Sequence, residues 1–398
     1  MAAPRSAQRR RTPTPPPAQA RKGERFAGEV RDLNSAGEGV VAHSTGRVLF
    51  VVGVWPGESG QFEITEIRGR AGRARLLSLE NASAHRSAPP CPHYGLGNTD
   101  CGGCPWQFMA YEQQLQAKQE RLQRVLLKLG VAGSLCPIWA APEPFGYRNR
   151  TQLKTDGKKL GFVARASNTI APIEDCLILN EKNRETLSQL RKQLPNPQWR
   201  PAKGKPWSAL HLDDHVDAEA LLVNERRPFR QGNSAQNTRM KNWLAEQLQA
   251  LDGPANAVEL FAGSGNFTEV LAAAGMRKIV AVDNFGPAVQ ALEKKGYSNL
   301  ITRVENLGRD GAAAALEKEL ADAELLLLDP PRDGLRGTAQ FLSRMGRLRD
   351  VIYISCDLAT FSRDLVAFMD AGFSLTLIQP LDLFPQTPHL ETMAVLRR

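Results

Sequence analysis

The sequence predicts an α/β protein in which a small β-barrel and a mixed central part precede a doubly wound, mostly parallel sheet. From Ser234 onward, apolar runs alternate with helical stretches, as in a parallel sheet covered by helices. Between residues 24 and 80, short alternating runs are separated by Gly and Pro, which is typical of a small barrel. With 398 residues, the chain is long enough for two or three domains.

The N-terminal region carries most of the net charge of +9. Residues 1–23 contain six basic residues and no acid, so the remainder carries only +3. A proline cluster at 13–17, without the apolar run of a signal peptide, predicts a disordered basic tail. No stretch approaches the ~18–20 apolar residues that span a bilayer, and the cysteine content argues against a disulfide scaffold. We expect a cytoplasmic, monomeric protein.

The predicted barrel has strands near residues 26–30, 47–52 and 61–67. Four arginines follow the last of these runs: Arg68, Arg70, Arg73 and Arg75. Such a run is either a solvated surface or a rim that contacts phosphates, and the sequence favours neither.

The central part begins with an irregular Cys-, Gly- and Pro-rich stretch at residues 89–106. Residues 108–129 then show a helical apolar stripe that ends before Gly130. Residues 145–225 look mixed and strand-rich.

Three cysteines of the central part cluster, and a fourth lies further along the chain. Cys101 and Cys104 form a C-x-x-C pair, Cys91 precedes them, and Cys176 is the remote fourth. Three close thiols with a remote partner can hold zinc or an iron–sulfur cluster. The spacing alone does not choose between these metals, and unliganded thiols are the third interpretation.

The C-terminal part predicts strands at 258–261, 278–282, 325–328 and 351–354, with helices at 288–295 and 312–320. The first strand runs into a turn with Gly263 and Gly265, where backbone can approach a ligand closely. Asp283 ends the second strand, where an acid can bind ribose hydroxyls. Because this is not the three-glycine dinucleotide pattern, S-adenosylmethionine is favoured over NAD.

Three further side chains predict covalent chemistry. Asp329, in Asp329-Pro330-Pro331, ends the third strand, and Cys356 ends the fourth. Glu391 follows close to the end of the chain. A thiol nucleophile and a carboxylate base near a cofactor loop suggest attack on an electron-poor ring. In amino-nitrogen methylases an aromatic residue commonly follows Asp-Pro-Pro, whereas here Arg332 follows, which favours carbon methylation.

Together these motifs resemble the bacterial RNA uracil-C5 methyltransferases, in particular the TRAM-bearing, iron–sulfur type that acts on 23S ribosomal RNA. Tyr147-Arg148-Asn149 and the segment 229–233, with its FxQxN pattern, support the resemblance, as does the cysteine pattern. It covers nearly all of the chain after residue 23. It implies a TRAM RNA-binding barrel at 24–82, a central [4Fe–4S] domain at 83–227 and a methyltransferase domain at 228–398.

The resemblance also implies roles for single residues. Cys356 is then the nucleophile, Glu391 the base and Asp329 the acid that flanks cofactor and uracil. The implied cluster ligands are Cys91, Cys101, Cys104 and Cys176. The implied S-adenosylmethionine contacts are Gln231, Phe261, Gly263, Gly265, Asn266, Asp283, Asn306 and Asp329. The expected partner is RNA, most readily ribosomal RNA.

The chain departs from the family pattern beside the nucleophile and near the base. Asp357 and Leu358 stand where Asn and Pro are usual, and Gln386 stands where His is common. A carboxylate next to Cys356 should raise the pKa of its thiol unless it points away. The alternatives are a transfer-RNA uracil-C5 methylase, an amino-nitrogen nucleic-acid methylase and a non-catalytic RNA-binding or assembly factor.

Overall fold

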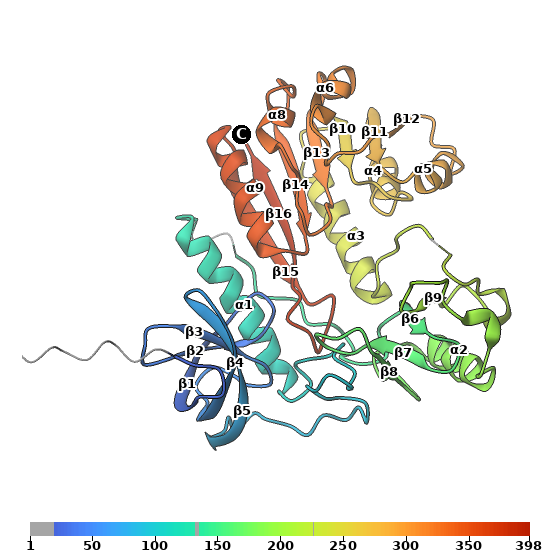
Figure 1. The fold of residues 1–398 in the computed structure, drawn as a ribbon. Helices are drawn as coiled ribbons and strands as arrows, with labels where there is room; N and C mark the ends of the chain where they lie inside the picture. The colour runs from blue at the N-terminus through green and yellow to red at the C-terminus, as the bar shows by residue number, and fades with distance from the viewer. Residues whose placement is uncertain (1–19, 132–134, 226) are drawn as a thin grey trace, which may run out of the picture. The chain divides into compact units, whose positions relative to one another are not determined.

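The structure, a computed structural model, describes residues 20–131, 135–225 and 227–398, so most of the expected disordered tail lies outside the described residues. The chain divides into two compact units, residues 1–86 and 87–398 (Figure 1). The domain boundaries expected at 23/24, 82/83 and 227/228 stay predictions. Among the described helices, none combines the length and apolar character that crossing a membrane requires.

The first unit is the closed β-barrel that the sequence predicts, with strand order β1-β2-β3-β5-β4 in its described part. The strands are β1 (Arg25–Leu33), β2 (Gly39–Ala42), β3 (Val48–Val51), β4 (Ser59–Arg68) and β5 (Ala71–Asn81). Alternate residues of β4, including Phe62 and Ile64, point inward and are fully buried. Gly60 is required where β4 crosses β5, because a Cβ there would lie 2.2 Å from the carbonyl oxygen of Ser78.

The central part of the second unit contains a four-stranded antiparallel sheet in the order β8-β7-β6-β9. Its strands are β6 (Arg150–Thr155), β7 (Leu160–Val163), β8 (Ile170–Pro172) and β9 (Ser208–Asp213), and helix α2 (Glu181–Lys192) contributes to the same core. The predicted helix at 108–129 is α1 (Tyr111–Lys128). Leu122 and Leu126 of its predicted apolar stripe are buried, but so are the polar Gln114 and Lys118.

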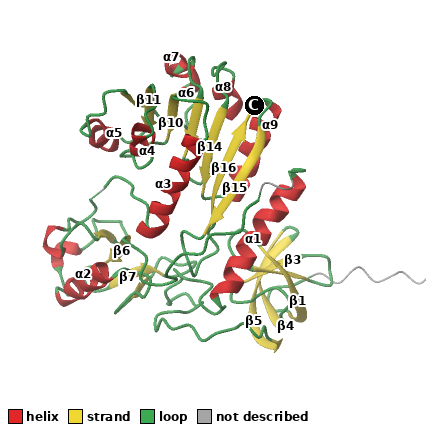
Figure 2. Cartoon of the chain, turned by 180° about the vertical axis from the view of Figure 1, so that it is seen from behind, coloured by secondary structure: helices red, strands yellow, loops and turns green. Residues whose placement is uncertain are grey.

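The described C-terminal part forms a seven-stranded sheet in the order β12-β11-β10-β13-β14-β16-β15. Its strands are β10 (Asn256–Leu260), β11 (Lys278–Asp283), β12 (Leu300–Val304), β13 (Leu325–Leu328), β14 (Asp350–Ser355), β15 (Ser374–Leu381) and β16 (Glu391–Arg397). The first five in spatial order are parallel, and β16 is antiparallel to both β14 and β15. Figure 2 shows β14, β16 and β15 side by side. This is the predicted α/β architecture with an antiparallel edge.

Two apolar cores cover the two faces of this sheet (Figure 1). Helix α9 (Leu358–Asp370), α8 (Thr338–Leu342) and part of α1 pack on one face, and α3 (Ser234–Gln249) with α4 (Thr268–Ala273) pack on the other. The predicted helix at 288–295 is α5 (Gly286–Glu293). The single helix predicted at 312–320 is instead two short ones, α6 (Ala312–Ala315) and α7 (Glu317–Leu320), because Leu316 leaves the helical conformation.

Candidate functional site

The carboxyl ends of β10, β13 and β14 meet at one edge of the sheet. Leu260 pairs with Leu328, and Leu328 pairs with Tyr353. The chain order reverses at β10, whose neighbours are β11 and β13, so this edge is the topological switch point where α/β sheets bind ligands. The Gly turn, the Asp-Pro-Pro segment and Cys356 all leave the sheet here, as their positions after apolar runs predict.

Glu391 reaches the same edge because β16 runs antiparallel to β14. The register pairs Ser355 with Thr392, so the next step places Cys356 opposite Glu391. Glu391 is buried and Cys356 is half-buried. The structure thus brings Cys356, Asp329 and Glu391 together from three segments that are distant in sequence.

The pKa values of all three groups are raised. Burial raises the pKa of the Cys356 thiol to about 12, and the charges of Glu391 and Asp329 act in the same direction, while Arg332 opposes them. Burial raises the pKa of Asp329 to about 7, and a hydrogen bond from Gln231 opposes that shift. Burial and the nearby Asp329 also raise the pKa of Glu391 well above its usual range. Without ligands, a neutral thiol is therefore favoured at pH 7, and the pKa of Glu391 lies well above that of a free carboxyl.

Asp357 serves as a helix cap. It is the N-cap of α9, and its Oδ1 accepts hydrogen bonds from the backbone N–H groups of Ala359 and Thr360, each at 3.0 Å. These bonds direct the carboxylate toward the first turn of the helix. Asp357 raises the pKa of the Cys356 thiol less than Glu391 and Asp329 do.

The side chains of Arg332 and His389 meet beside this site. Arg332 Nη2 lies 3.1 Å from His389 Nε2, and the Arg332 carbonyl oxygen accepts from Thr360 Oγ1 at 3.0 Å. Burial and nearby cations, first among them Arg332, lower the pKa of His389 to about 4. His389 is therefore neutral at pH 7, and its Nε2 can accept from the guanidinium.

Gln231, within the predicted FxQxN segment, contacts the Asp329 carboxylate directly. Its Nε2 donates to Asp329 Oδ2 at 3.3 Å. Asn149 fixes the segment from the central sheet, because its Nδ2 donates to the Gln231 carbonyl oxygen at 2.9 Å. The two predicted motifs, Tyr147-Arg148-Asn149 and 229–233, are therefore in contact.

A cavity opens beside the Gly turn. Among its lining residues are the predicted Phe261 and Asn306, and its volume is about 320 Å³. Phe261 and Gly263 lie in the left-handed region, with φ of 67° and 55°. A Cβ on Gly263 would meet nothing within 4 Å, so this backbone faces open space. Sequence reasoning missed Asn284, Asp333 and Arg336 on the same cavity, because they lie in loops without a motif of their own.

The remaining predicted cofactor residues support the turn itself. Asp283 Oδ2 accepts from the Gly263 N–H at 2.8 Å. Gly265 has a φ of 86°, which favours glycine, and a Cβ there would also lie 2.4 Å from Leu292 Cδ1. Asn266 exchanges two hydrogen bonds of 2.9 Å with Asn237 of α3.

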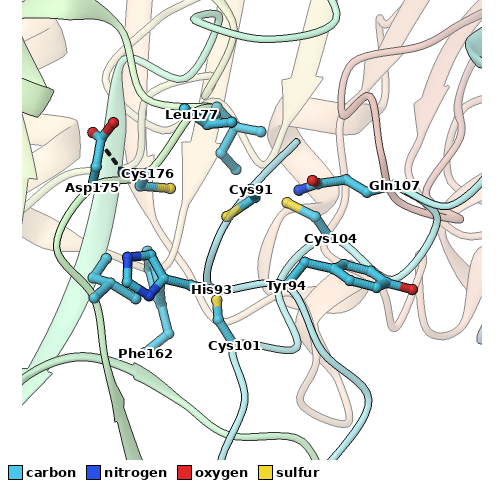
Figure 3. Close-up of a pocket in the computed structure, with 12 residues that line it drawn as sticks. Cys91, His93, Tyr94, Cys101, Cys104, Gln107, Phe162, Asp175, Cys176 and Leu177 are labelled. Atoms are coloured by element: carbon cyan, nitrogen blue, oxygen red, sulfur yellow. Dashed lines mark hydrogen bonds between the residues drawn. The ribbon is translucent and has the colours of Figure 1, made fainter. Parts of the chain in front are cut away.

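The four predicted metal ligands line a second cavity. Cys91, Cys101 and Cys104 come from the irregular stretch and Cys176 from the loop before α2, and their sulfur atoms point toward a common centre (Figure 3). Burial raises the pKa of Cys104 and of Cys176 to about 12.

N–H groups near three of these sulfur atoms favour the thiolate form and oppose the effect of burial. Cys101 receives a backbone hydrogen bond from Gly103, and Cys104 receives one from the Gln107 side chain. Cys176 receives two, from the backbone of residues 178 and 179. Within the described ranges, the one set of three potential ligand atoms mutually within 4.8 Å is Asp213, Asp214 and His215, where Arg230 already pairs with both carboxylates. No three of the four cysteine sulfurs are therefore mutually within 4.8 Å.

Known proteins similar to this chain are RNA methyltransferases. Residues 217–398 match the family model tRNA (Uracil-5-)-methyltransferase. The chain is 44% identical over 380 residues to an uncharacterized RNA methyltransferase of Nitrosomonas europaea, covering 94% of this chain and 97% of the relative. It is 32% identical to the 23S rRNA (uracil(1939)-C(5))-methyltransferase RlmD of Edwardsiella ictaluri, covering 92% and 94%.

A solved structure shares the fold. The Pyrococcus abyssi tRNA (uracil-54, C5)-methyltransferase, in complex with S-adenosyl-L-homocysteine, aligns with a TM-score of 0.68 at 20% identity. The alignment covers 93% of this chain and 100% of that chain.

Proposed function

The chain belongs to the S-adenosylmethionine-dependent RNA uracil-C5 methyltransferases, and from this we propose that it methylates a uridine of 23S ribosomal RNA through a covalent adduct at Cys356. The juxtaposition of Cys356 and Glu391 across β14 and β16 carries the proposal. The 32% identical relative is named for 23S rRNA, which favours ribosomal over transfer RNA.

Each step of this mechanism has a group at the sheet edge. The Cys356 thiolate adds to uracil C6, and the electron pair of the C5–C6 double bond moves to form an enolate. C5 then takes the methyl group from the cofactor sulfonium, which leaves as a neutral thioether. Glu391 removes the C5 proton, and the C6–S bond breaks to return the thiolate. A raised pKa suits Glu391 to this task, because the ionised carboxylate is then a stronger base.

Asp329 and Gln231 orient the ring rather than exchange its protons. Gln231 holds Asp329 by the hydrogen bond described above, and both can reach polar edges of a uracil placed over Cys356. A base inside a duplex cannot reach this edge, so the uridine must leave its stack. The cavity at Phe261 and Asn306 would hold S-adenosylmethionine, with the open backbone at Gly263 admitting close approach.

We propose that the four-cysteine cavity holds a [4Fe–4S] cluster. The four thiols that converge on one cavity, the N–H groups near three of the sulfurs and the resemblance of the cysteine pattern to the iron–sulfur type support this assignment. The cluster lies outside the methyl-transfer steps, so we assign it a structural or RNA-contacting role.

We propose the barrel as a TRAM-type RNA-binding module. Arg68, Arg73 and Arg75 each pair with a glutamate of the barrel. Of these three pairs, only the Arg68–Glu66 pair is exposed on both sides. Such exposed pairs are worth only ~0–1 kcal/mol, so a phosphate can replace Glu66 at small cost.

A covalent trap tests the function. RNA with 5-fluorouridine has no C5 proton for Glu391 to remove, so the methylated adduct should accumulate on wild-type protein as a denaturation-stable gel shift. Cys356→Ala should give none, while Cys136→Ala, which removes another half-buried cysteine, should trap like wild type. The absence of an adduct with wild type, with S-adenosylmethionine shown to bind, would refute the covalent mechanism. Mapping 5-methyluridine in ribosomal and transfer RNA of a deletion strain identifies the substrate.

A further inference from the structure

A buried segment of irregular backbone leads to Glu391. This base-leading segment, residues 382–390, joins β15 to β16. Asp382 is 0% exposed and Gln386 is 4% exposed, and Gln386 has a φ of 68°, which a residue other than glycine rarely adopts. Buried backbone without regular pairing requires hydrogen-bond partners from elsewhere. Helix α1 supplies them.

An ion pair fixes the start of the segment to α1. Lys118 Nζ donates to Asp382 Oδ1 at 2.6 Å and to the Phe384 carbonyl oxygen at 3.3 Å. Tyr111 Oη donates to Asp382 Oδ2 at 2.9 Å. The side chains of both Lys118 and Asp382 are completely buried. The two oxygens of the carboxylate therefore have separate donors, which determine its position and its orientation.

The same helix face fixes the rest of the segment. Gln114 Nε2 donates to Gln386 Oε1 at 2.9 Å, and Gln114 Oε1 accepts from the Gln386 N–H at 3.0 Å. Arg121 Nη1 donates to the Pro388 carbonyl oxygen at 2.9 Å. The four helix residues that make these contacts recur every three or four positions, so they lie on one side of α1: Tyr111, Gln114, Lys118 and Arg121.

The Lys118–Asp382 ion pair lies next in the chain to the residue that pairs with Glu391. Leu381, the last residue of β15, is the cross-strand partner of Glu391, and Asp382 follows it. A displacement of Asp382 therefore moves the backbone that is hydrogen-bonded beside Glu391. Well-packed apolar residues commonly match or exceed a buried ion pair in stability. Stability alone does not explain why this polar contact is built here.

We propose that Lys118 is a positioning residue for the general base and, through Asp382, sets where the Glu391 carboxylate stands relative to the C5 proton. The inference rests on the proposed function, because it assigns Lys118 to the proton-removal step. Cys356 belongs to β14 and its following turn, which α1 does not hold by these contacts. Loss of the ion pair should therefore slow proton removal more than adduct formation.

The test uses full-length protein and natural uridine RNA in single-turnover reactions, and follows both covalent adduct and released 5-methyluridine RNA. Lys118→Met should slow product release on the order of 10²-fold, and methylated adduct should accumulate. Lys118→Arg, which keeps the charge and hydrogen bonds, should restore part of the release rate. Lys128→Met, at the exposed end of the same helix, is the matched control and should behave like wild type.

A double variant separates positioning from stability. Lys118→Met with Asp382→Asn buries no lone charge, and the Asn oxygen can still accept from Tyr111, so the thermal midpoint should return toward wild type. If product release stays slow in the double variant, the positioning role of Lys118 is supported. If the rate of product release recovers together with the thermal midpoint, the positioning role is overturned. Tyr111→Phe, a milder change, covers the case in which Lys118 variants do not fold. Tyr111→Phe should accumulate methylated adduct to a smaller degree than Lys118→Met. A wild-type ratio of adduct to released product in Tyr111→Phe would overturn the proposal.

The positioning role of Lys118 and the covalent mechanism at Cys356 can be refuted by separate results. If wild type forms no adduct with 5-fluorouridine RNA, the covalent mechanism fails for every variant. If wild type forms the adduct and Lys118→Met releases product at the wild-type rate, the positioning role alone is wrong.

Discussion

At the scale of single residues, the site raises the pKa of each of its three acidic groups in the absence of ligands. Cys356, Asp329 and Glu391 all have raised pKa values, and each acid raises the pKa of the thiol. Because S-adenosylmethionine carries a positive sulfonium, its binding should favour the charged forms of all three. This would confine thiolate reactivity to the loaded enzyme.

The raised thiol pKa predicts slow alkylation of Cys356 in the cofactor-free protein. Only the thiolate reacts, so the rate should rise about tenfold per pH unit from pH 7 to 9 without a plateau. Asp329→Asn removes a negative charge and should lower the pKa, which makes alkylation faster at any given pH. Peptide mapping after iodoacetamide treatment measures this, with Asp333→Asn as the control. A wild-type plateau near pH 8 would contradict the raised pKa.

Glu391→Gln should allow Cys356 to attack and the methyl group to transfer, and then stall. Glutamine is nearly isosteric but cannot take the C5 proton. Methylated adduct should therefore accumulate on natural uridine RNA, visible as a gel-shifted complex. Adding Cys356→Ala should remove that complex. Normal turnover by Glu391→Gln would exclude Glu391 as the base.

The sequence made the reactive residues recognisable, but not the roles of their neighbours. Asp329 and Cys356 follow strongly apolar runs, which identifies them as strand-end residues, while Glu391 stands out only as a carboxylate that follows them near the end of the chain. Asp357 could be suspected of disturbing the thiol, and only backbone geometry reveals it as a helix cap. Gln114 and Lys118 look like the solvated side of an amphipathic helix, because the segment that buries them lies far along the chain.

At the scale of elements, the four parallel strands predicted around the Gly turn are present with ends shifted by two residues or fewer. Their uninterrupted apolar runs are specific to strands buried on both faces. The antiparallel β15 and β16 were not predicted, because pairing distant strands depends on tertiary contacts. The prediction of a single helix at 312–320 was wrong in its middle, where the helix is interrupted at Leu316. Tertiary structure overrides the helix propensity of the alanine-rich segment there.

The cysteine stretch has little regular structure, so its order should depend on metal. Cys104→Ser should abolish the iron and acid-labile sulfide of anaerobically purified protein and lower the thermal midpoint, since the metal supplies folding energy. Cys136→Ser, outside the cavity, should keep both iron and midpoint. Stoichiometric zinc without sulfide in wild type would show that the cluster assignment is wrong.

At the scale of the whole molecule, charge is distributed unevenly along the chain. Residues 1–22 carry six of the nine net positive charges and none of the proposed site residues. Deleting them should weaken RNA binding and reduce the salt slope of log K by about 0.7–0.9 for each phosphate that they neutralise. Methyl transfer at saturating RNA should be unchanged. Filter binding across a salt series measures the slope, and an identical slope would show that these residues do not contact RNA.

The pairing of β14 with β16 has a consequence for how such a chain tolerates length changes during evolution. Cys356 and Glu391 are adjacent through strand register, while α9 and β15 intervene in sequence. Insertions or deletions at the turn around Gly372 can therefore be absorbed without separating the two residues. A one-residue insertion within β16, however, would turn its following side chains to the opposite face of the sheet. Length polymorphism among functional descendants should accordingly concentrate in that turn and be excluded from the two strands.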